Sequence, residues 1–369
     1  MWVTCSQASL LKGVQLASRA ISTRTTMPIL SYILLETMKN GIRLTATDLE
    51  FAVQVDIDAE VRQGGQGTLP ARILSEIVGN LPDATVEIKA EEGAHQVEIT
   101  CDASNFEILG LPAGDFPALP KSDGNEIGAI DADMLRTMVS QTIFAVSADE
   151  TRPFLTGVYV TMDGPEVQFV ATDGGRLALR KTVLASPAKQ KAGVIVPAKT
   201  MQELMRALGS VNGEVQLAMA DNQLLFTVPG LRIYSRLISG QFPNYQQVIP
   251  KEFKQRIRVQ TGRLLRAVRR VAITARDSAN VVRMAAKDKK LTITSNTPEV
   301  GKAREEVEVA ADGDTIEAAF NARYLMDCLS NIDADELVFE LTGPLSPGAI
   351  RPAGHSDYVY VLAPVRVYG

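Results

Sequence analysis

The sequence predicts an α+β fold in which one domain is repeated three times. A ten-residue pattern recurs with alanines at Ala71, Ala198 and Ala322, which are 127 and 124 residues apart. A Gly-x-Phe-Pro pattern recurs at 114–117 and 240–243. In a chain of 369 residues, repeats at this spacing indicate three copies of one structural unit.

The recurring pattern has the periodicity of an amphipathic helix in each copy. Its apolar residues follow the i, i+3, i+4, i+7 spacing that lines one helical face. These positions are 74, 77, 78 and 81; 201, 204, 205 and 208; and 325, 328, 329 and 332. We therefore expect helices over 70–81, 197–208 and 322–332.

A second helix precedes the recurring one in each copy, over 10–17, 134–146 and 264–275. Alternating apolar residues predict strands, and Asn40-Gly41 predicts a hairpin turn. The expected strands are 32–36, 42–47, 51–57, 86–90, 96–101, 106–109, 155–162, 168–171, 281–285, 291–294, 337–341 and 358–362. Two helices packed on antiparallel sheets make each unit α+β.

The domain boundaries follow from the repeats and from one polar segment. Residues 121–125, Lys-Ser-Asp-Gly-Asn, are typical of a linker. We place the domains at 1–122, 126–249 and 251–369. Hydrophobic residues form 46% of the chain, which is enough for a core in each domain.

The overall charge argues against a nucleic-acid binder whose entire surface is basic. The chain has 43 acidic and 38 basic residues, a net charge of −5. No apolar run approaches the roughly 18 residues of a membrane span, and Lys12 interrupts the N-terminal apolar stretch. We expect no signal peptide, no membrane contact and a cytoplasmic location.

The cysteines and histidines predict neither a metal site nor a cofactor. Cys5, Cys101 and Cys328 are scattered and odd in number, which favours buried thiols in a reducing compartment over disulfides. His95 and His355 have no ligand spacing with them or with each other.

Basic residues are segregated into the first helix of each copy. The stretches 6–24, 134–148 and 262–276 contain no Asp or Glu. Their basic residues are Lys12, Arg19, Arg24, Arg136, Arg263, Arg266, Arg269, Arg270 and Arg276. Arg263, Arg266 and Arg270 share one helical face because they are spaced i, i+3, i+7. The pattern fits either ordinary solvated faces or a surface for a polyanion.

The recurring helices each carry a basic residue in the first turn, at Arg72, Lys199 and Arg323. The helix macrodipole disfavours cations there. An acidic residue follows four positions later in each copy, so a local ion pair is one explanation. An external polyanion is the other, and it would bind through phosphates without sequence preference.

Catalytic motifs are absent from the sequence. It has no phosphate loop, no Gly-x-Gly-x-x-Gly, no His-Glu-x-x-His and no Gly-x-Ser-x-Gly. Asp48 and Asp173 each follow Ala-Thr after a strand, where they would form Asx turns. A phosphate-handling enzyme using these two carboxylates would need further convergent acids or histidines. A β-rich scaffold without nucleic acid would leave the basic helices unexplained.

Four motifs carry a resemblance that covers essentially the whole chain. They are 24–30 (Arg-Thr-Thr-Met-Pro-Ile-Leu), 171–178 (Ala-Thr-Asp-Gly-Gly-Arg-Leu-Ala), 242–250 (Phe-Pro-Asn-Tyr to Pro) and 360–366 (Tyr-Val-Leu-Ala-Pro-Val-Arg). With these motifs the chain resembles the bacterial DNA polymerase III β subunits, the replicative sliding clamps. The resemblance implies a DNA-clamp fold and a head-to-tail homodimer that closes into a ring around duplex DNA. It implies a non-catalytic processivity factor that slides without sequence preference.

The resemblance also implies three sets of site residues. DNA contacts fall on Lys12, Arg19, Arg24, Arg72, Arg136, Lys199, Arg206, Arg263, Arg266, Arg270 and Arg323. A pocket for short peptides of the polymerase III catalytic subunit, the clamp loader and other partners falls on Leu155, Thr172, Gly174, Gly175, Arg176, Leu177, Pro243, Gln247, Val248, Asn321, Tyr324, Val361, Ala363, Pro364, Val365 and Arg366. The dimer interface falls on Phe106, Ile273 and Thr274.

The sequence departs from the family pattern at several of these positions. Gly175 replaces a usual histidine, and Ala363 and Val365 stand where methionines are frequent. Residues 367–369 extend the usual end. Smaller side chains predict a roomier, less adaptable pocket, and hence an altered affinity for the usual peptide motif.

Overall fold

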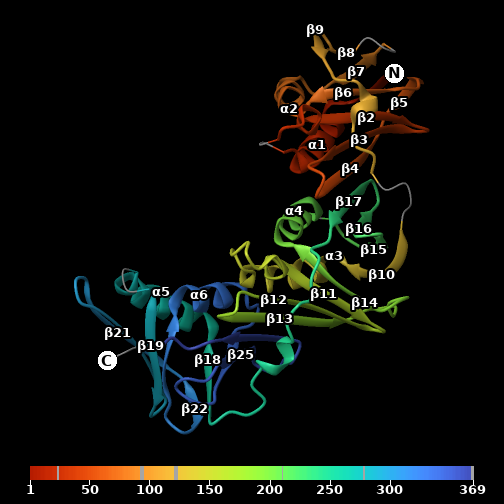
Figure 1. The fold of residues 1–369 in the computed structure, drawn as a ribbon. Coiled ribbons are helices and arrows are strands. Elements are labelled where there is room, and N and C mark those ends of the chain that lie inside the picture. The colour runs from red at the N-terminus through yellow and green to blue at the C-terminus, as the bar shows by residue number, and fades with distance from the viewer. Residues whose placement is uncertain (23–24, 92–94, 120–123, 210, 277–278, 367–369) are drawn as a thin grey trace. The chain divides into compact units, whose positions relative to one another are not determined.

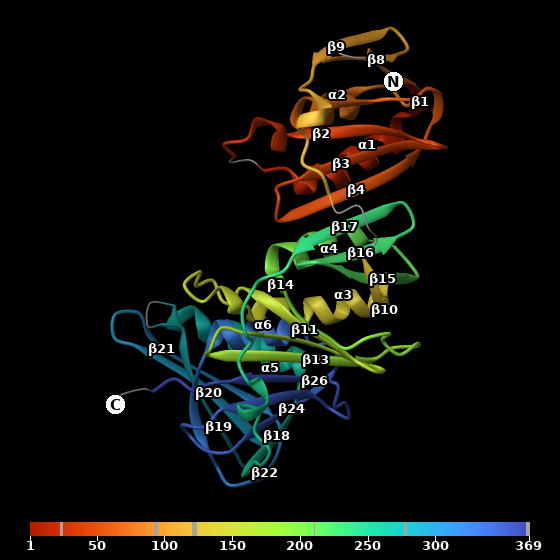
Figure 2. The same ribbon diagram turned by 45° about the vertical axis from the view of Figure 1, so that its right-hand side comes forward.

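The computed structural model describes residues 1–22, 25–91, 95–119, 124–209, 211–276 and 279–366. The chain divides into two compact units, Met1–Ala132 with Glu203–Leu237, and Asp133–Gln202 with Ile238–Gly369. Every pairing between described strands is antiparallel, as the sequence predicts. Figures 1 and 2 show helices packed against sheets in each unit, so the α+β assignment is confirmed.

The first unit contains two sheets with α1 (Gln7–Ala17) and α2 (Ala71–Asn80) in contact with each other. Its strands are β1 Trp2–Ser6, β2 Tyr32–Met38, β3 Gly41–Thr47, β4 Phe51–Asp58, β5 Glu60–Gln63, β6 Gln66–Pro70, β7 Thr85–Ala90, β8 Gln96–Cys101, β9 Ser104–Leu109, β10 Asn125–Asp131, β15 Glu214–Ala220, β16 Gln223–Val228 and β17 Leu231–Arg236. The sheet orders are β5-β1-β7-β8-β9 and β10-β15-β16-β17-β4-β3-β2-β6.

The second unit contains two further sheets, with α3 (Ala132–Ser140), α5 (Thr261–Ala275) and α6 (Ala322–Asn331). Its strands are β11 Gly157–Asp163, β12 Glu166–Thr172, β13 Arg176–Val183, β14 Ala192–Pro197, β18 Gln255–Gln260, β19 Val281–Lys287, β20 Lys290–Thr297, β21 Gly301–Glu308, β22 Ala310–Gly313, β23 Glu317–Asn321, β24 Glu336–Leu341, β25 Gly348–Pro352 and β26 Tyr358–Leu362. The sheet orders are β14-β11-β12-β13-β26-β25-β24-β18-β22 and β21-β20-β19-β23. Figure 2 shows α5 and α6 close together, and they are in contact.

The two large sheets continue across the predicted domain boundaries. In the first unit, β17 pairs with β4, so a strand of the second repeat extends a sheet of the first. In the second unit, β26 pairs with β13, which joins the third repeat to the second. The sequence did not predict this joining, because it follows from pairing between strands that are far apart in the chain.

The apolar stripes of the recurring helices are buried, which confirms the periodicity argument. On α2, Leu74 and Val78 are fully buried, and on α6 Leu325 and Cys328 are fully buried. The helix α4 (Ala198–Leu208) buries its own apolar positions in the same way. All three cysteines are buried free thiols, as predicted.

The helix predicted over 134–146 is shorter and begins earlier than expected. Instead, α3 ends at Ser140, and residues Ile143–Ala145 form a 3₁₀ turn. The hydroxyl of Thr142 donates to the carbonyl of Met138 at 2.7 Å, so it satisfies a carbonyl that a longer helix would use. Because α3 begins at Ala132, it includes Asp133, and the first helix of the second repeat is not free of acids.

In the part of the chain that the structure describes, no helix is both long and apolar enough to cross a membrane.

Gly41 follows the β2–β3 turn, and its lack of a side chain lets the backbone of β4 approach closely. A Cβ atom on Gly41 would lie 2.3 Å from the carbonyl oxygen of Ile57 on β4. Gly79 on α2 has nothing nearer than 4.0 Å to such an atom. The two glycines therefore differ in what a methyl group would meet.

We expect Gly41→Ala to destabilise the protein by about 1–3 kcal/mol, because the backbone of β4 must shift to admit the methyl group. Gly79→Ala is the matched control, and a helical Ala should leave stability unchanged or raise it by about 1 kcal/mol. Urea unfolding of both variants measures the difference. Equal unfolding midpoints would contradict the steric argument.

Candidate nucleic-acid and peptide interfaces

The predicted DNA-facing cations of the first unit lie on α1, on the 3₁₀ turn Ser18–Ala20 and on α4. Lys12 is exposed and makes no ion pair with any described residue. Arg19 contacts Glu203 on α4, with 3.3 Å between Nη1 and Oε2. Glu203 also pairs with Arg206, so one carboxylate serves two of the predicted cations.

On α5, two of the three predicted arginines are ion-paired. The Arg270 guanidinium makes a two-pronged contact with Glu305 of β21, at 2.6 and 2.9 Å. The hydrogen bond from Arg270 lowers the pKa of Glu305. Arg263 reaches Glu308 at 3.3 Å, whereas Arg266 is exposed and without an ion pair among the described residues.

The remaining predicted cations have different surroundings. Arg136 is half-buried and pairs with Asp133. Arg72 is exposed and makes the local pair with Glu76, at 2.9 Å. Lys199 and Arg323 are both exposed. Arg24 lies outside the described residues.

The loop before β13 is built on an Asx turn, as the sequence predicts. Asp173 Oδ1 accepts hydrogen bonds from the backbone N–H groups of Gly175 and Arg176, at 2.8 and 3.0 Å. Thr172 Oγ1 donates to the Arg176 carbonyl at 2.6 Å, and Gly174 takes a φ of +94°. Asp48 forms the corresponding turn before β4 in the first unit. Both carboxylates therefore have a structural role, which removes the basis for a catalytic pair.

Arg176 is the most constrained charged side chain of the candidate peptide site. Its side chain is only 10% exposed, and it pairs with Asp173 at 3.0 Å and with Asp327 of α6 at 2.5 Å. The Tyr324 ring lies 4.2 Å from the guanidinium carbon, and the Phe144 ring lies 5.7 Å from it. Burial opposes the charge, but the hydrogen bond with Asp327 and the nearby carboxylates raise the pKa of Arg176.

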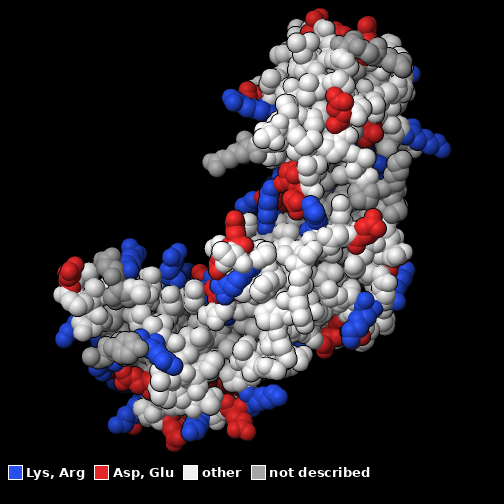
Figure 3. Space-filling view, in the orientation of Figure 1, with Lys and Arg blue, Asp and Glu red and all other residues white. Residues whose placement is uncertain are grey.

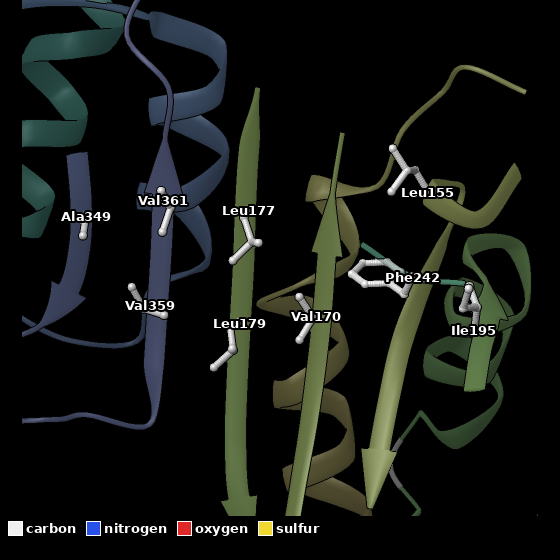
Figure 4. Packing of buried hydrophobic residues seen from close by; sticks show 9 residues of the cluster. All are labelled: Leu155, Val170, Leu177, Leu179, Ile195, Phe242, Ala349, Val359 and Val361. Atoms are coloured by element: carbon white, nitrogen blue, oxygen red, sulfur yellow. The ribbon is translucent and has the colours of Figure 1, made fainter. Parts of the chain in front are cut away.

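The structure also brings together apolar residues of the predicted pocket. Leu155, Leu177 and Val361 belong to one buried cluster with Phe242. Figure 4 shows Leu177 and Val361 on neighbouring strands, with Leu155 and Phe242 on the same side of the cluster. Tyr159 stacks on Phe242, with ring centroids 4.8 Å apart.

The backbone after β26 is hydrogen-bonded to the loop before β13 and to β23. The backbone N–H of Ala363 donates to the Gly175 carbonyl at 2.9 Å, and that of Val365 donates to the Ala319 carbonyl at 2.7 Å. Asn321 caps α6 by accepting from the Arg323 N–H at 2.9 Å.

The other predicted pocket residues are more open. Pro243, Gln247, Val248 and Arg366 are exposed, and Pro364 is half-buried. The 367–369 extension lies outside the described residues.

The predicted dimer residues lie on one edge strand and on one helix. Phe106 is half-buried on β9, which is an edge strand of its sheet. Leu109 on the same strand is 74% exposed, and Ile273 on α5 is 58% exposed. Thr274 turns inward, with its hydroxyl 2.5 Å from the hydroxyl of Ser295.

Models of one family match nearly all of the chain in three consecutive segments. The N-terminal, central and C-terminal domains of the DNA polymerase III beta subunit match residues 1–120, 129–244 and 246–366. The chain belongs to this family. The resemblance that the motifs indicated is therefore confirmed, together with the clamp fold of three repeated domains.

Similar proteins agree with this assignment. The beta sliding clamp of Bacillus subtilis (strain 168) is 34% identical, and that of Synechocystis is 32% identical, with all of each chain covered. Among solved structures, a Bacillus subtilis sliding clamp matches with a TM-score of 0.96 at 33% identity. A Pseudomonas aeruginosa clamp bound to griselimycin matches at 0.94 and 32%, and both structures cover the whole chain. Sliding clamps are non-catalytic processivity subunits of the polymerase III holoenzyme, which confirms the predicted function.

Several residues at these surfaces were not predicted from the sequence. A local pair between Asp327 and Arg323 is one of the two explanations that the sequence allows, but Asp327 pairs with Arg176. The sequence did not indicate that Phe144 contacts Arg176, because Phe144 falls among the apolar residues of the helix predicted over 134–146. Glu305 and Glu308 lie on β21, a strand that the sequence did not predict.

Proposed function

We propose that two copies of this chain close head to tail into a ring that holds duplex DNA topologically, in the cytoplasm. Our three domains, 1–122, 126–249 and 251–369, would give such a ring six domains. The single observation that carries the proposal is the set of exposed basic side chains on the repeated helices, among them Lys12, Arg266 and Arg323. Such dispersed cations bind phosphates without reading sequence, which is what sliding requires.

We further propose that the predicted peptide site receives short segments of the polymerase III catalytic subunit, the clamp loader and other partners. The apolar cluster of Leu155, Leu177 and Val361 supports this role, as does the fixed charge of Arg176, the residue before Leu177 on β13. Apolar walls with a few oriented polar groups suit a peptide's hydrophobic anchors. Tethering a polymerase in this way raises its effective concentration at the primer end.

Topological binding is tested by linearising the DNA. The protein is loaded by its clamp loader onto nicked circular DNA, which is then cut once. We expect bound protein to be lost from the linear DNA but retained on uncut circles, because a ring slides off a free end. Retention on the linear form would reject the ring.

The proposed dimer contact joins the β9 edge of one subunit to α5 of the other. We expect Ile273→Asp to convert the dimer to monomer, because it buries an unpaired charge in the contact. Leu345→Asp is the matched control, since Leu345 is also a largely exposed apolar residue but lies outside the predicted interface. Light scattering after size exclusion measures the mass, and a dimeric Ile273→Asp variant would contradict the assignment.

The departures at Gly175 and Ala363 are tested by peptide titration. A Cβ atom at 175 would lie 3.3 Å from Tyr324 Cε2, so Gly175→His must displace that ring. Ala363→Met should tighten binding several-fold, since each buried methylene contributes about 0.8 kcal/mol. Ala185→Met, at an exposed position, is the control. If the affinity of a clamp-binding peptide is unchanged by Gly175→His and Ala363→Met together, the altered-pocket hypothesis is wrong.

A further inference from the structure

Carboxylates, most of them from other elements, lie against several of the cations that we propose to face DNA. In the first unit, Glu203 of α4 contacts Arg19 and Arg206. In the second unit, Glu305 and Glu308 of β21 contact Arg270 and Arg263 of α5. Figure 3 shows the same mixture on the face it displays, where blue and red side chains are interspersed and form no continuous blue surface.

The contact between Glu305 and Arg270 is specific in its geometry. Both carboxylate oxygens accept from the guanidinium, at 2.6 and 2.9 Å. Glu305 pairs across the sheet with Ile293, which is fully buried, so its side chain starts on the face that packs against α5. The neighbouring Glu306 points to the opposite face and binds Lys290 and Arg304. Adjacent residues on one strand thus have separate partners.

Glu203 occupies a more enclosed position than the acids of β21. Its side chain is only 13% exposed. It contacts two arginines, Arg19 of the first repeat and Arg206 of α4 itself. One negative charge is therefore shared by two arginines at this point.

These pairs change how the surface interacts with a polyanion. DNA binding is driven largely by counterions released when protein cations neutralise phosphates. An arginine already neutralised by a carboxylate adds little to that release. Because exposed ion pairs are weak, at about 0–1 kcal/mol, a phosphate can still compete for the guanidinium.

We propose that Glu203, Glu305 and Glu308 limit the affinity of this chain for DNA by neutralising cations of its DNA-facing helices. They hold the number of effective phosphate contacts below the number of basic residues present. Weak net attraction leaves retention on DNA to the closed ring and keeps the barrier to sliding low. The inference rests on the proposed function, because it requires these helices to face DNA.

The test measures DNA affinity against salt for the Glu305→Gln/Glu308→Gln double variant. Glutamine keeps a hydrogen-bond acceptor but removes the charge. Each phosphate contact contributes a slope of about −0.9 in log affinity against log salt, so we expect the slope to steepen by roughly 1 to 2. The probe is a short fluorescent duplex, followed by anisotropy in a salt series around 0.1 M. On long DNA, loaded rings of this variant should diffuse more slowly.

Glu306→Gln is the matched control, because it removes the same charge from the same strand but its partners, Lys290 and Arg304, are not among the predicted DNA-facing cations. It should steepen the slope less than the double variant does. Glu203→Gln tests the first unit independently. An unchanged slope for both Glu203→Gln and the double variant, with unaltered unfolding midpoints, would overturn the inference.

A separate variant distinguishes failure of the inference from failure of the proposed function. Arg266→Gln removes an exposed cation that has no ion pair among the described residues. If Arg266→Gln weakens DNA binding while the acidic variants have no effect, the DNA-facing assignment stands and only the carboxylate role is wrong. If Arg266→Gln and Arg270→Gln both leave binding unchanged, the helices do not face DNA and both proposals fail.

Discussion

Pairing between strands of successive repeats is the constraint on which the rest of this structure depends. In the second unit, β13 and β26 set Arg176 opposite Leu362 and Leu177 opposite Val361. This register puts Leu177 of the second repeat and Val361 of the third repeat on the same face of the sheet. Both side chains belong to one apolar cluster. A slip of one residue would send both side chains to the other face. The candidate peptide site is therefore a consequence of how two repeats share a sheet.

Arg176, the residue before Leu177 on β13, forms a charged network whose partners lie outside the apolar cluster. Arg176 begins β13, so its guanidinium can reach both the Asx turn of Asp173 and the helix that carries Asp327. A buried arginine requires such partners, because an unpaired charge in that position would be costly. The network spans the second and third repeats, and it holds Tyr324 against the guanidinium. Side chains that are already fixed in this way lose little conformational entropy when a ligand binds to them.

The acidic residue of each recurring helix has a different set of partners in each of the three copies. Each recurring helix has an acidic residue four positions after a basic one. In α2 the two form a local pair, Arg72 with Glu76. In α4 the acid, Glu203, contacts Arg19 and Arg206, and in α6 the acid, Asp327, contacts Arg176. Spacing along a helix shows which side chains are neighbours on it, but other elements decide which partner is nearer.

The sequence by itself determined the three repeats, the α+β class, the buried stripes of the helices, the Asx turns and the family. These features depend on local periodicity and short motifs, which can be recognised in the chain directly. Edge strands such as β5 and β22 are only four residues long, which is too short for an alternation of apolar and polar residues to be recognised. Only the tertiary structure decided that sheets continue between repeats and that Glu203, Glu305 and Glu308 contact Arg19, Arg270 and Arg263. Those contacts join residues up to 184 positions apart, so no local pattern records them.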